Sequence, residues 1–417
     1  MKLMVIGSGG REHAIIKKLS ENPEITKIYV LPGNAGMSDL AECVSIAATD
    51  IDAQVKFACE NSIDYAVVTP DDPLALGAVD ALTAAGIPCF GPDKKAALIE
   101  ASKAFAKDLM HKYNIPTADY AVFDDMDKAL AYLHEQTCPI VIKADGLALG
   151  KGVIIAETMT EAEEAVRSIM ADRSFGDAGK TIVIEEFLTG PEVSVLTFTD
   201  GKTLVPMVSS MDHKRALDGD QGLNTGGMGT IAPNPFYTPE IAEISMRTIF
   251  LPTIRAMEAE GRLFRGCLYF SLMLTKDGPK VIEYNCRFGD PETQVVLPLM
   301  QSDLFTVMKE TTDGTLRAED VRFSDGAACC VIMASQGYPG KYQKGFEITV
   351  DDSVKDSVIY AGAAWKDGRL VTNGGRVLGV LGMGKDLREA IARAYENTEK
   401  VTFANAYCRK DIGRKAL

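Results

Sequence analysis

Apolar runs and amphipathic stretches alternate along the first hundred residues of the chain. The apolar runs are short, which is typical of buried strands, and the amphipathic stretches have the length of short helices. The predicted strands span 3–6, 28–31 and 65–69, and the predicted helices span 11–19 and about 74–85. Strands that alternate with helices predict a parallel α/β sheet with right-handed crossovers. A domain boundary is expected after Phe90-Gly91-Pro92.

The middle of the chain combines helices, strands and one long glycine-rich loop. A helix over 94–113 is expected to stop before Asn114-Ile115-Pro116, which breaks helices. Further helices are predicted over 161–170 and 239–260, and strands over 140–143, 153–156, 181–187, parts of 193–208, 267–275 and 280–285. A loop as long as 209–235 is more often functional than idle in a compact domain. From about residue 325, short strands and turns precede a helix near 387–401.

Length, composition and charge indicate how many domains the chain has and which ligands it can bind. A chain of 417 residues predicts two to four domains with substantial cores. Its 46% hydrophobic and 24% charged residues are typical of a globular protein. The formal charge of −14 argues against nucleic-acid binding, because no basic excess is present to neutralise phosphates along a duplex. A small phosphorylated substrate needs only a local cluster of Lys and Arg.

The cysteines bear on the cellular compartment of the protein, and the histidines bear on whether it has a zinc site. The nine cysteines show no C-x-x-C spacing, which favours reduced thiols in the cytoplasm. Four scattered histidines make a histidine zinc site an unattractive hypothesis. No signal peptide is recognised at the start, and no apolar run approaches the length of a membrane span. We therefore expect a cytoplasmic protein with no membrane partner.

The segment from Lys280 to Gln294, KVIEYNCRFGDPETQ, carries the clearest chemistry. Strand side chains alternate, so Glu283, Asn285 and Arg287 are expected on one face. A carboxylate and an amide oxygen suit Mg²⁺, and a guanidinium suits a phosphate. An edge strand with solvated charges would explain the acids at 290 and 292, but not three polar residues on one face of a core strand.

Two glycine turns follow predicted strands in the first forty residues. Gly7-x-Gly9-Gly10 resembles a dinucleotide fingerprint, but Glu12 replaces its third glycine and no acidic residue ends the second strand, so a nicotinamide cofactor is disfavoured. Amides at a helix N-terminus can still bind an anion, and Arg11 adds a charge there. The turn 32–36 can face the same crevice. On residue type alone, simple βα turns explain both segments equally well.

Three further segments are candidates for ligand contacts. Lys143 ends an apolar run and precedes a glycine-rich loop with Gly150, although the loop does not match the Walker A spacing. A surface hairpin would explain Lys151 but not Lys143. The strand 181–188 ends in two acids, which alone indicates no more than a solvated strand end. The charged residues 212–215 precede a glycine cluster at 224–229, for which a disordered surface loop is the alternative.

Taken together, these motifs resemble the ATP-grasp ligases, and specifically their phosphoribosylamine–glycine ligase family. The segments that carry the resemblance are GSGGREHA, PGNAG, GPDKKAALIEASKAFAK, IKADGLALGKGV, IEEFLTGPEVS, NTGGMG, IEYNCRFGDPETQ, GYPGKYQKG and NGGRVLGV. They stand in the family's order over essentially the full chain. NTGGMG together with RFGDPETQ is specific for this family rather than for ATP-grasp enzymes at large.

The resemblance implies a three-domain fold and a reaction. It implies an N-terminal parallel α/β domain (1–101), a central ATP-grasp domain (102–324) with a mobile lid at about 117–190, and a small C-terminal α+β domain (325–417). The implied reaction joins glycine to 5-phosphoribosylamine with ATP through a glycyl phosphate, as a step of purine biosynthesis. The implied cofactors are ATP and Mg²⁺ or Mn²⁺, and the implied assembly is a monomer or weak homodimer.

The resemblance also implies roles for particular residues. Those for ATP are Lys103, Lys143, Gly150, Glu185, Glu186, Leu188 and Glu192. Those for the metal are Glu283 and Asn285. The implied catalytic residues are Arg287, Asp290, Asp212 and Lys214. Those for the remaining substrates are Gly9, Gly10, Arg11, Gly33, Asn34, Asn224, Thr225, Gly226 and Gly227.

Two other functions are compatible with the same motifs. The first is an ATP-grasp ligase that couples a carboxylate to a different amine. The second is a module that binds ATP without catalysing a reaction. Such a module would be expected to have lost Glu283, Asn285 or Arg287, and all three are present.

Overall fold

The computed structural model describes residues 1–147, 152–172, 174 and 176–417. Its N-terminal part is a five-stranded parallel sheet with the strand order β3-β2-β1-β4-β5. The strands are β1 (Lys2–Gly7), β2 (Lys27–Pro32), β3 (Glu42–Cys43), β4 (Tyr65–Val68) and β5 (Cys89–Phe90). The order changes direction between β1 and β4, and such a switch opens a crevice at the carboxyl ends of both strands. Helix α1 (Gly10–Leu19) begins at this crevice, and α2 (Ile51–Glu60) follows β3.

Two helices predicted as continuous are broken. The stretch predicted as 74–85 forms α3 (Asp71–Leu76) and α4 (Ala78–Ala84), because Gly77 adopts a left-handed conformation with φ of 97°. The stretch predicted as 94–113 forms α5 (Lys94–Ala101) and α6 (Lys103–Lys112). Ser102 is extended between them, and its hydroxyl accepts a hydrogen bond from Phe105 N at 3.0 Å. A serine that caps a new helix competes with helix continuation.

The central part contains two antiparallel sheets. The first, with the order β6-β9-β7-β8, has α7 (Met126–Leu133) and α8 (Met159–Met170) packed on it. Its strands are β6 (Tyr120–Phe123), β7 (Ile140–Ala144), β8 (Val153–Ala156) and β9 (Ile182–Glu186). The second has the order β11-β10-β16-β17. Its strands are β10 (Glu192–Thr199), β11 (Leu204–Pro206), β16 (Gly266–Thr275) and β17 (Gly278–Asn285).

A helical run and two short helices accompany the second sheet. The predicted helix 239–260 is found as α9 (Pro239–Ser245), a π-helical turn (Met246–Phe250) and α10 (Leu251–Ala259). Pro252 lies at the start of α10, where its missing N–H accounts for the local change in hydrogen bonding. Helices α11 (Thr293–Val296) and α12 (Leu304–Asp313) follow β17.

The predicted loop 209–235 is largely structured, which corrects the sequence analysis. It contains β12 (Met211–Asp212), β13 (Arg215–Leu217), β14 (Gln221–Asn224) and β15 (Gly229–Ala232). Strands β12 and β15 join the C-terminal sheet, whose order is β12-β15-β18-β23-β20. Its other strands are β18 (Ala327–Ser335), β20 (Val358–Tyr360) and β23 (Arg376–Gly384), and α13 (Leu387–Thr398) packs on it. The missed strands are too short to show a periodicity of their own.

The remaining strands form small pairs. Strands β19 (Thr349–Val350) and β24 (Val401–Thr402) pair with each other, as do β21 (Ala363–Lys366) and β22 (Arg369–Thr372), while β25 (Ala406–Tyr407) pairs with β18.

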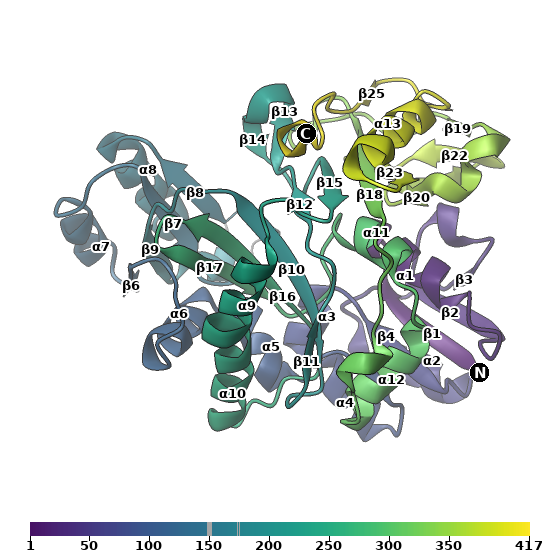
Figure 1. The fold of residues 1–417 in the computed structure, drawn as a ribbon, viewed down its shortest axis with the longest axis horizontal. Coiled ribbons are helices and arrows are strands. Elements are labelled where there is room, and N and C mark those ends of the chain that lie inside the picture. Colours follow the sequence, from purple (N-terminus) through teal and green to yellow (C-terminus); the bar gives the residue numbers. More distant parts are fainter. Residues whose placement is uncertain (148–151, 173, 175) are drawn as a thin grey trace.

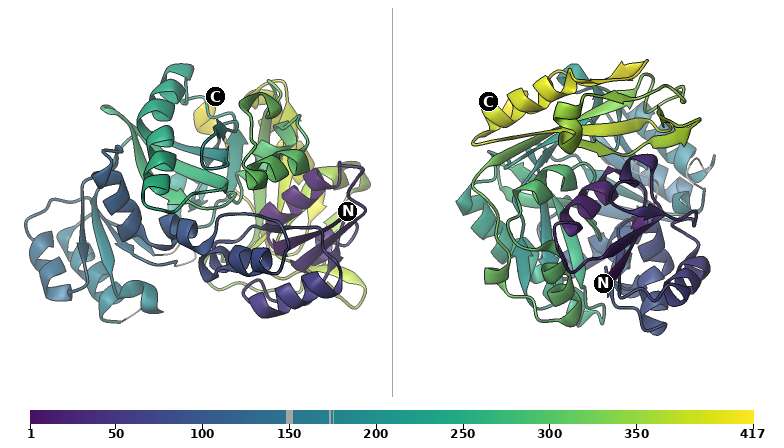
Figure 2. Two further views of the ribbon diagram at one scale, coloured as in Figure 1. Left: turned by 90° about the horizontal axis from the view of Figure 1, so that it is seen from below. Right: turned by 90° about the vertical axis from the view of Figure 1, so that its right-hand side faces the viewer.

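The first central sheet lies at one end of the molecule and the N-terminal sheet at the other (Figure 1). The first central sheet and its two helices have their own hydrophobic core, in which Ile142, Ile169 and Ile184 are at most 1% exposed. Figure 2 shows this sheet and its helices projecting away from the rest of the chain, with the C-terminal sheet packed over the N-terminal one. Among the described helices, none has the length and hydropathy needed to span a membrane. The predicted multidomain α/β and α+β class with a parallel N-terminal sheet is confirmed.

Candidate active site

The end of β17 carries a carboxylate and an amide two residues apart. Glu283 pairs with Ser271 of β16, and Asn285 pairs with Tyr269. The register between the two strands shifts at Ile282, and the Ile282 carbonyl accepts a hydrogen bond from Lys143 Nζ at 3.2 Å. A lysine of the first central sheet thus reaches the strand that bears Glu283.

Glu283 is surrounded by positive charge. Burial alone would raise the pKa of Glu283, but four nearby cations outweigh it, and the pKa lies below its ordinary value. These cations are Lys103, Lys143, Lys214 and Arg287. They come from α6, β7, the β12–β13 connection and the segment after β17. A concentration of cations around one carboxylate suits a polyanionic ligand such as a triphosphate.

The donors on β17 fit a hard divalent cation. Glu283 is held ionised by its surroundings, and Asn285 is a neutral oxygen donor with 9% exposure. Within the described ranges, no group of three or more His, Cys, Asp or Glu side chains gathers into a metal cluster. A site with one carboxylate and one amide suits Mg²⁺, which keeps water and phosphate oxygens among its ligands.

Arg287 is held by a glutamate that the sequence analysis did not identify. Arg287 Nη2 lies 2.9 Å from Glu100 Oε1, and Glu100 Oε2 accepts from Cys286 N at 2.7 Å. Burial raises the pKa of Glu100, and Arg287 opposes that shift. Arg287 Nε is buried without a hydrogen-bond acceptor among the described residues. A fixed guanidinium with a free donor can bind an oxyanion of a ligand.

Lys103 and Lys143 approach the same region from two elements. Lys103 is the first residue of α6, and its Nζ donates to Gly146 O at 3.2 Å. Lys143 Nζ lies 3.0 Å from Glu185 Oε2 on the neighbouring strand β9. Gly150, predicted as an ATP contact, lies outside the described residues, as does Lys151.

The remaining predicted ATP residues lie at the end of β9 and the start of β10. Leu188 is buried, whereas Glu186 and Glu192 are exposed. Glu192 Oε2 lies 3.0 Å from Lys214 Nζ. Glu186 lies 3.5 Å from Lys280 Nζ. The Glu192–Lys214 contact places a predicted ATP residue beside a predicted substrate residue.

The two N-terminal glycine turns lie side by side. Gly33 N donates to Gly7 O at 3.0 Å, and Asn34 Nδ2 donates to Ser8 O at 2.8 Å. Asn34 Nδ2 also reaches Tyr360 O at 3.1 Å, and its Oδ1 accepts from Gly36 N. The Asn34 side chain therefore holds the two turns and the C-terminal sheet together.

Glu12 explains why the first turn departs from a dinucleotide fingerprint. Its carboxylate accepts from Gly9 N at 2.5 Å and from Thr69 Oγ1 at 2.6 Å. It also pairs with Arg11 Nε at 2.6 Å. One amide that we expected to bind an anion is thus occupied by the protein itself. Arg11 Nη1 reaches Phe288 O at 3.2 Å and so joins α1 to the segment after β17.

Arg376 of the C-terminal sheet reaches the predicted substrate residues and was missed by the sequence analysis. Its Nη1 lies 2.8 Å from both Gly226 O and Asp290 O, and its Nη2 lies 3.3 Å from Asp290 Oδ2. Asp290 Oδ1 accepts from Gln294 Nε2 at 2.7 Å. Burial would raise the pKa of Asp290, but Arg376 and Arg11 hold it below its ordinary value.

Two acidic side chains lie beside these residues, Glu292 buried and Asp212 partly exposed. Glu292 is 3% exposed, and its Oε1 accepts from Tyr269 OH at 2.9 Å. Burial, followed by the Glu292 charge, raises the pKa of Asp212 well above its ordinary value. Gly227 packs directly on Asp212, since a Cβ on Gly227 would lie 2.6 Å from Asp212 Oδ1. The backbone O of Lys214 accepts from both N and Oγ1 of Thr225, at 2.8 Å each.

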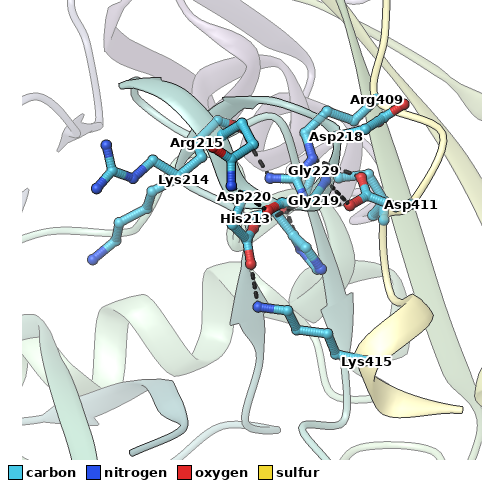
Figure 3. A network of polar contacts seen from close by, with 12 residues as sticks. His213, Lys214, Arg215, Asp218, Gly219, Asp220, Gly229, Arg409, Asp411 and Lys415 are labelled. Carbon is cyan, nitrogen blue, oxygen red and sulfur yellow. Dashed lines mark hydrogen bonds and ion pairs between the residues drawn. The ribbon is translucent and has the colours of Figure 1, made fainter. Parts of the chain in front are cut away.

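The C-terminal tail anchors the loop that carries several of these residues (Figure 3). Arg409 is 1% exposed and pairs with Asp411 at 2.8 Å and with Asp220 at 3.0 Å. Asp411 accepts from Gly219 N at 2.8 Å. Lys214 points away from this network. The tail therefore holds the β13–β14 connection while Lys214 remains directed elsewhere.

Comparison with known proteins decides the family. The Phosphoribosylglycinamide synthetase N domain matches residues 1–100, the ATP-grasp (A) domain matches 101–293 and the C domain matches 328–415. The chain belongs to the phosphoribosylamine–glycine ligase family. A relative of that name from Caldanaerobacter subterraneus is 47% identical over 99% of both chains. One from Pasteurella multocida is 46% identical over 100% of this chain and 98% of that protein.

Solved structures agree with the family. The crystal structure of phosphoribosylamine–glycine ligase from Thermotoga maritima is 34% identical, with a TM-score of 0.88, over 99% of this chain and 100% of that one. The biotin carboxylase domain of a Hydrogenobacter thermophilus 2-oxoglutarate carboxylase, solved with MgADP and bicarbonate, has a TM-score of 0.75. It is 16% identical and covers 98% of this chain and 91% of that one, so it shows the shared fold. The predicted family and ligase class are confirmed.

Three residues of the site were not identified from the sequence, although two of them had signals there that went unused. Lys107 lies one helical turn after Lys103 on α6, a spacing that places both on one face. Arg376 belongs to NGGRVLGV, a segment used only as evidence for the family. Glu100 lies in the helix before Ser102, and no local pattern connects it to Arg287.

Proposed function

We propose that this chain joins glycine to 5-phosphoribosylamine with hydrolysis of ATP to ADP and phosphate, giving glycinamide ribonucleotide. The observation that carries the proposal is the convergence of four cations on Glu283, beside Asn285. A glycine carboxylate is a poor electrophile, and transfer of the γ-phosphoryl group converts it into an acyl phosphate. Such a transfer depends on positioning and charge neutralisation more than on a protein nucleophile.

We place ATP beside the cations that surround Glu283. We assign Lys103 and Lys143 to the ATP phosphates, Glu185, Glu186 and Leu188 to the adenine, and Glu192 to the ribose, with Gly150 also at the nucleotide. Glu283 and Asn285 would hold Mg²⁺ or Mn²⁺, which neutralises phosphate charge when bound. Arg287, fixed by Glu100, donates to the phosphoryl group in transfer.

We place phosphoribosylamine and glycine beside the residues around Asp290. We assign Gly9, Gly10, Arg11, Gly33 and Asn34 to the phosphoribosylamine crevice, and Asn224, Thr225, Gly226 and Gly227 to its border with the glycine site. Asp290 and Lys214 orient the reacting groups. Asp212 accepts the proton that the amine releases as its nitrogen attacks the acyl carbon and phosphate leaves, because a raised pKa makes Asp212 a better base.

The domain organisation supports water exclusion. We propose domains at 1–101, 102–324 and 325–417, with the segment 117–190 closing over ATP. Its separate hydrophobic core permits movement as a unit. Closure would protect the acyl phosphate from hydrolysis. We further propose that the enzyme acts in the cytoplasm as a monomer or weak homodimer.

One assay tests the function. Purified protein is mixed with ATP, Mg²⁺, glycine and freshly prepared phosphoribosylamine, and both ADP and glycinamide ribonucleotide are measured. We expect equal amounts of the two products, and neither when glycine or phosphoribosylamine is omitted. Replacement of glycine by alanine tests a different carboxylate, and replacement of phosphoribosylamine by ribosylamine tests a different amine. ADP release that does not depend on glycine would refute the proposal.

A further inference from the structure

A buried cluster of three charges lies between α6 and the first central sheet. Lys107, Lys143 and Glu185 are 2%, 3% and 4% exposed. Lys107 Nζ and Lys143 Nζ each lie 3.0 Å from the same atom, Glu185 Oε2. Glu185 Oε1 is buried without a donor among the described residues. Two cations therefore share one carboxylate oxygen.

The cluster carries one surplus positive charge. Burial of an unpaired charge is costly, so a cluster of two cations and one anion is tolerated where it serves a ligand. Lys143 faces the ligand side, because its charge acts on Glu283 and its Nζ donates to Ile282 O. A triphosphate at Glu283 would offset the surplus charge.

Lys107 is tied to the base of the first central sheet. Its Nζ donates to Thr117 Oγ1 at 2.8 Å and approaches Ala118 O at 3.4 Å. Thr117 Oγ1 in turn donates to Val281 O of β17 at 2.7 Å. These contacts fix Lys107 beside β17, where the chain passes from α6 into the first central sheet. Of the two lysines, Lys143 is the one placed to turn toward phosphate.

We propose that Lys107 is a positioning residue for ATP, because it neutralises Glu185 and leaves the charge of Lys143 available to the ATP phosphates. The inference rests on the proposed assignment of Lys143 to those phosphates. Without Lys107, Glu185 and Lys143 would form a one-to-one buried ion pair that ATP must break. With Lys107 present, Glu185 keeps a partner when Lys143 turns to the phosphates.

The ionisation of Lys107 supports this role. Burial lowers the pKa of Lys107 to about 8, with Glu185 and Glu186 opposing the shift and Lys143 adding to it. The Tyr120 ring also faces Lys107, 5.7 Å from its Nζ. Lys107 is therefore charged below about pH 8 and loses its charge above it. We expect ATP affinity to fall as the pH rises through 8, and this fall to be absent in Lys107→Met.

The decisive experiment compares charge-altered variants of the full-length protein. Dissociation constants for ATP and for adenosine are measured by calorimetry for Lys107→Met, Lys107→Arg and the double variant Lys107→Met/Glu185→Gln. Lys107→Met should weaken ATP binding about tenfold or more, as expected for loss of a unit charge near the phosphates, and leave adenosine binding unchanged. The double variant restores the net charge and should recover most of the loss in ATP affinity relative to adenosine affinity, a ratio that cancels the assigned contact of Glu185 with the adenine. Lys107→Arg should stay close to the parent.

Two further variants separate this inference from the proposed function. Lys112→Met, on the exposed end of the same helix, is the matched control and should bind ATP as the parent does. If Lys143→Met retains ATP affinity, the proposed ATP site is wrong. If Lys143→Met loses affinity while Lys107→Met does not, the site stands and the role of Lys107 is overturned. Equal loss of ATP and adenosine in Lys107→Met, with no recovery in the double variant, would show a purely structural role.

Discussion

Replacement of Arg287 by lysine tests whether the guanidinium acts on phosphoryl transfer or only on ATP binding. Lysine keeps the positive charge and can keep the pair with Glu100, which Arg287 Nη2 makes at 2.9 Å. It removes Nε, the donor that is buried without an acceptor among the described residues. The substitution therefore deletes a directional donor while leaving the local charge in place.

The expected magnitude follows from the number of donors lost. One donor aimed at developing charge contributes about 3 kcal/mol to the transition state, which is roughly a hundredfold in rate. ATP affinity should change by less than about threefold, because Lys103, Lys143 and Lys214 remain around Glu283. We therefore expect kcat to fall about a hundredfold at nearly constant KM for ATP.

The assay measures kcat and KM for ATP at saturating glycine and phosphoribosylamine, with ADP release as readout. Arg317→Lys is the matched control, since Arg317 is exposed and pairs with Asp320, three residues along the chain. Thermal unfolding of both variants shows whether the Glu100 pair survives. If ATP binding collapses while kcat holds, Arg287 is a ground-state anchor and the reasoning is wrong.

Three further outcomes are expected. Glu283→Gln should abolish most activity and raise the metal concentration needed for half activity, as a metal titration would show; unchanged metal dependence would contradict its role as a ligand. Arg376→Met should raise KM for phosphoribosylamine about tenfold or more while ATP affinity stays constant, because it releases Asp290 and Gly226. Gly227→Ala should reduce kcat and lower stability by about 1–3 kcal/mol, because φ is +115° and the new Cβ would lie 2.6 Å from Asp212 Oδ1; normal turnover would show that the loop tolerates the shift.

The variants Glu283→Gln and Gly227→Ala each have a matched control. Glu243→Gln alters an exposed glutamate of α9 and should leave metal dependence unchanged. Gly261→Ala places alanine at φ of +68° with no neighbouring atom within 4 Å. It places alanine at a positive φ with milder strain and without the clash, so its kcat should match that of the parent.

Most strands and turns were predictable because their signals are local. Apolar runs such as 140–143 and 153–156 appear as β7 and β8, and the acids at the end of 181–187 appear at the end of β9. The break at Gly77 depends on a left-handed conformation that glycine permits but does not require. At Ser102 the cap bond to Phe105 N is local, but the Ser102 hydroxyl also donates to Asp145, 43 residues away, and Asp145 accepts from Ala104 N at the start of α6.

The candidate site also contains features that were predictable from the sequence and features that were not. The sequence alone was sufficient to predict Glu283, Asn285 and Arg287 as one group, because they share one short segment with alternating side chains. It was sufficient for the family as well, since the motifs occur in one order along the chain. These features require only neighbouring residues, so the chemistry of each segment could be read before its fold was known.

Only the tertiary structure decided which segments meet. The shared contact of Lys107 and Lys143 with Glu185 joins α6, β7 and β9, and the pair of Arg287 with Glu100 joins two elements 187 positions apart in the sequence. Arg376 reaches Gly226 because β12 and β15 join the C-terminal sheet, which no local pattern indicates. Burial and Coulomb interactions depend on distance in space rather than along the chain, and so the ionisation of Glu283, Asp212 and Lys107 follows from the packing of remote segments.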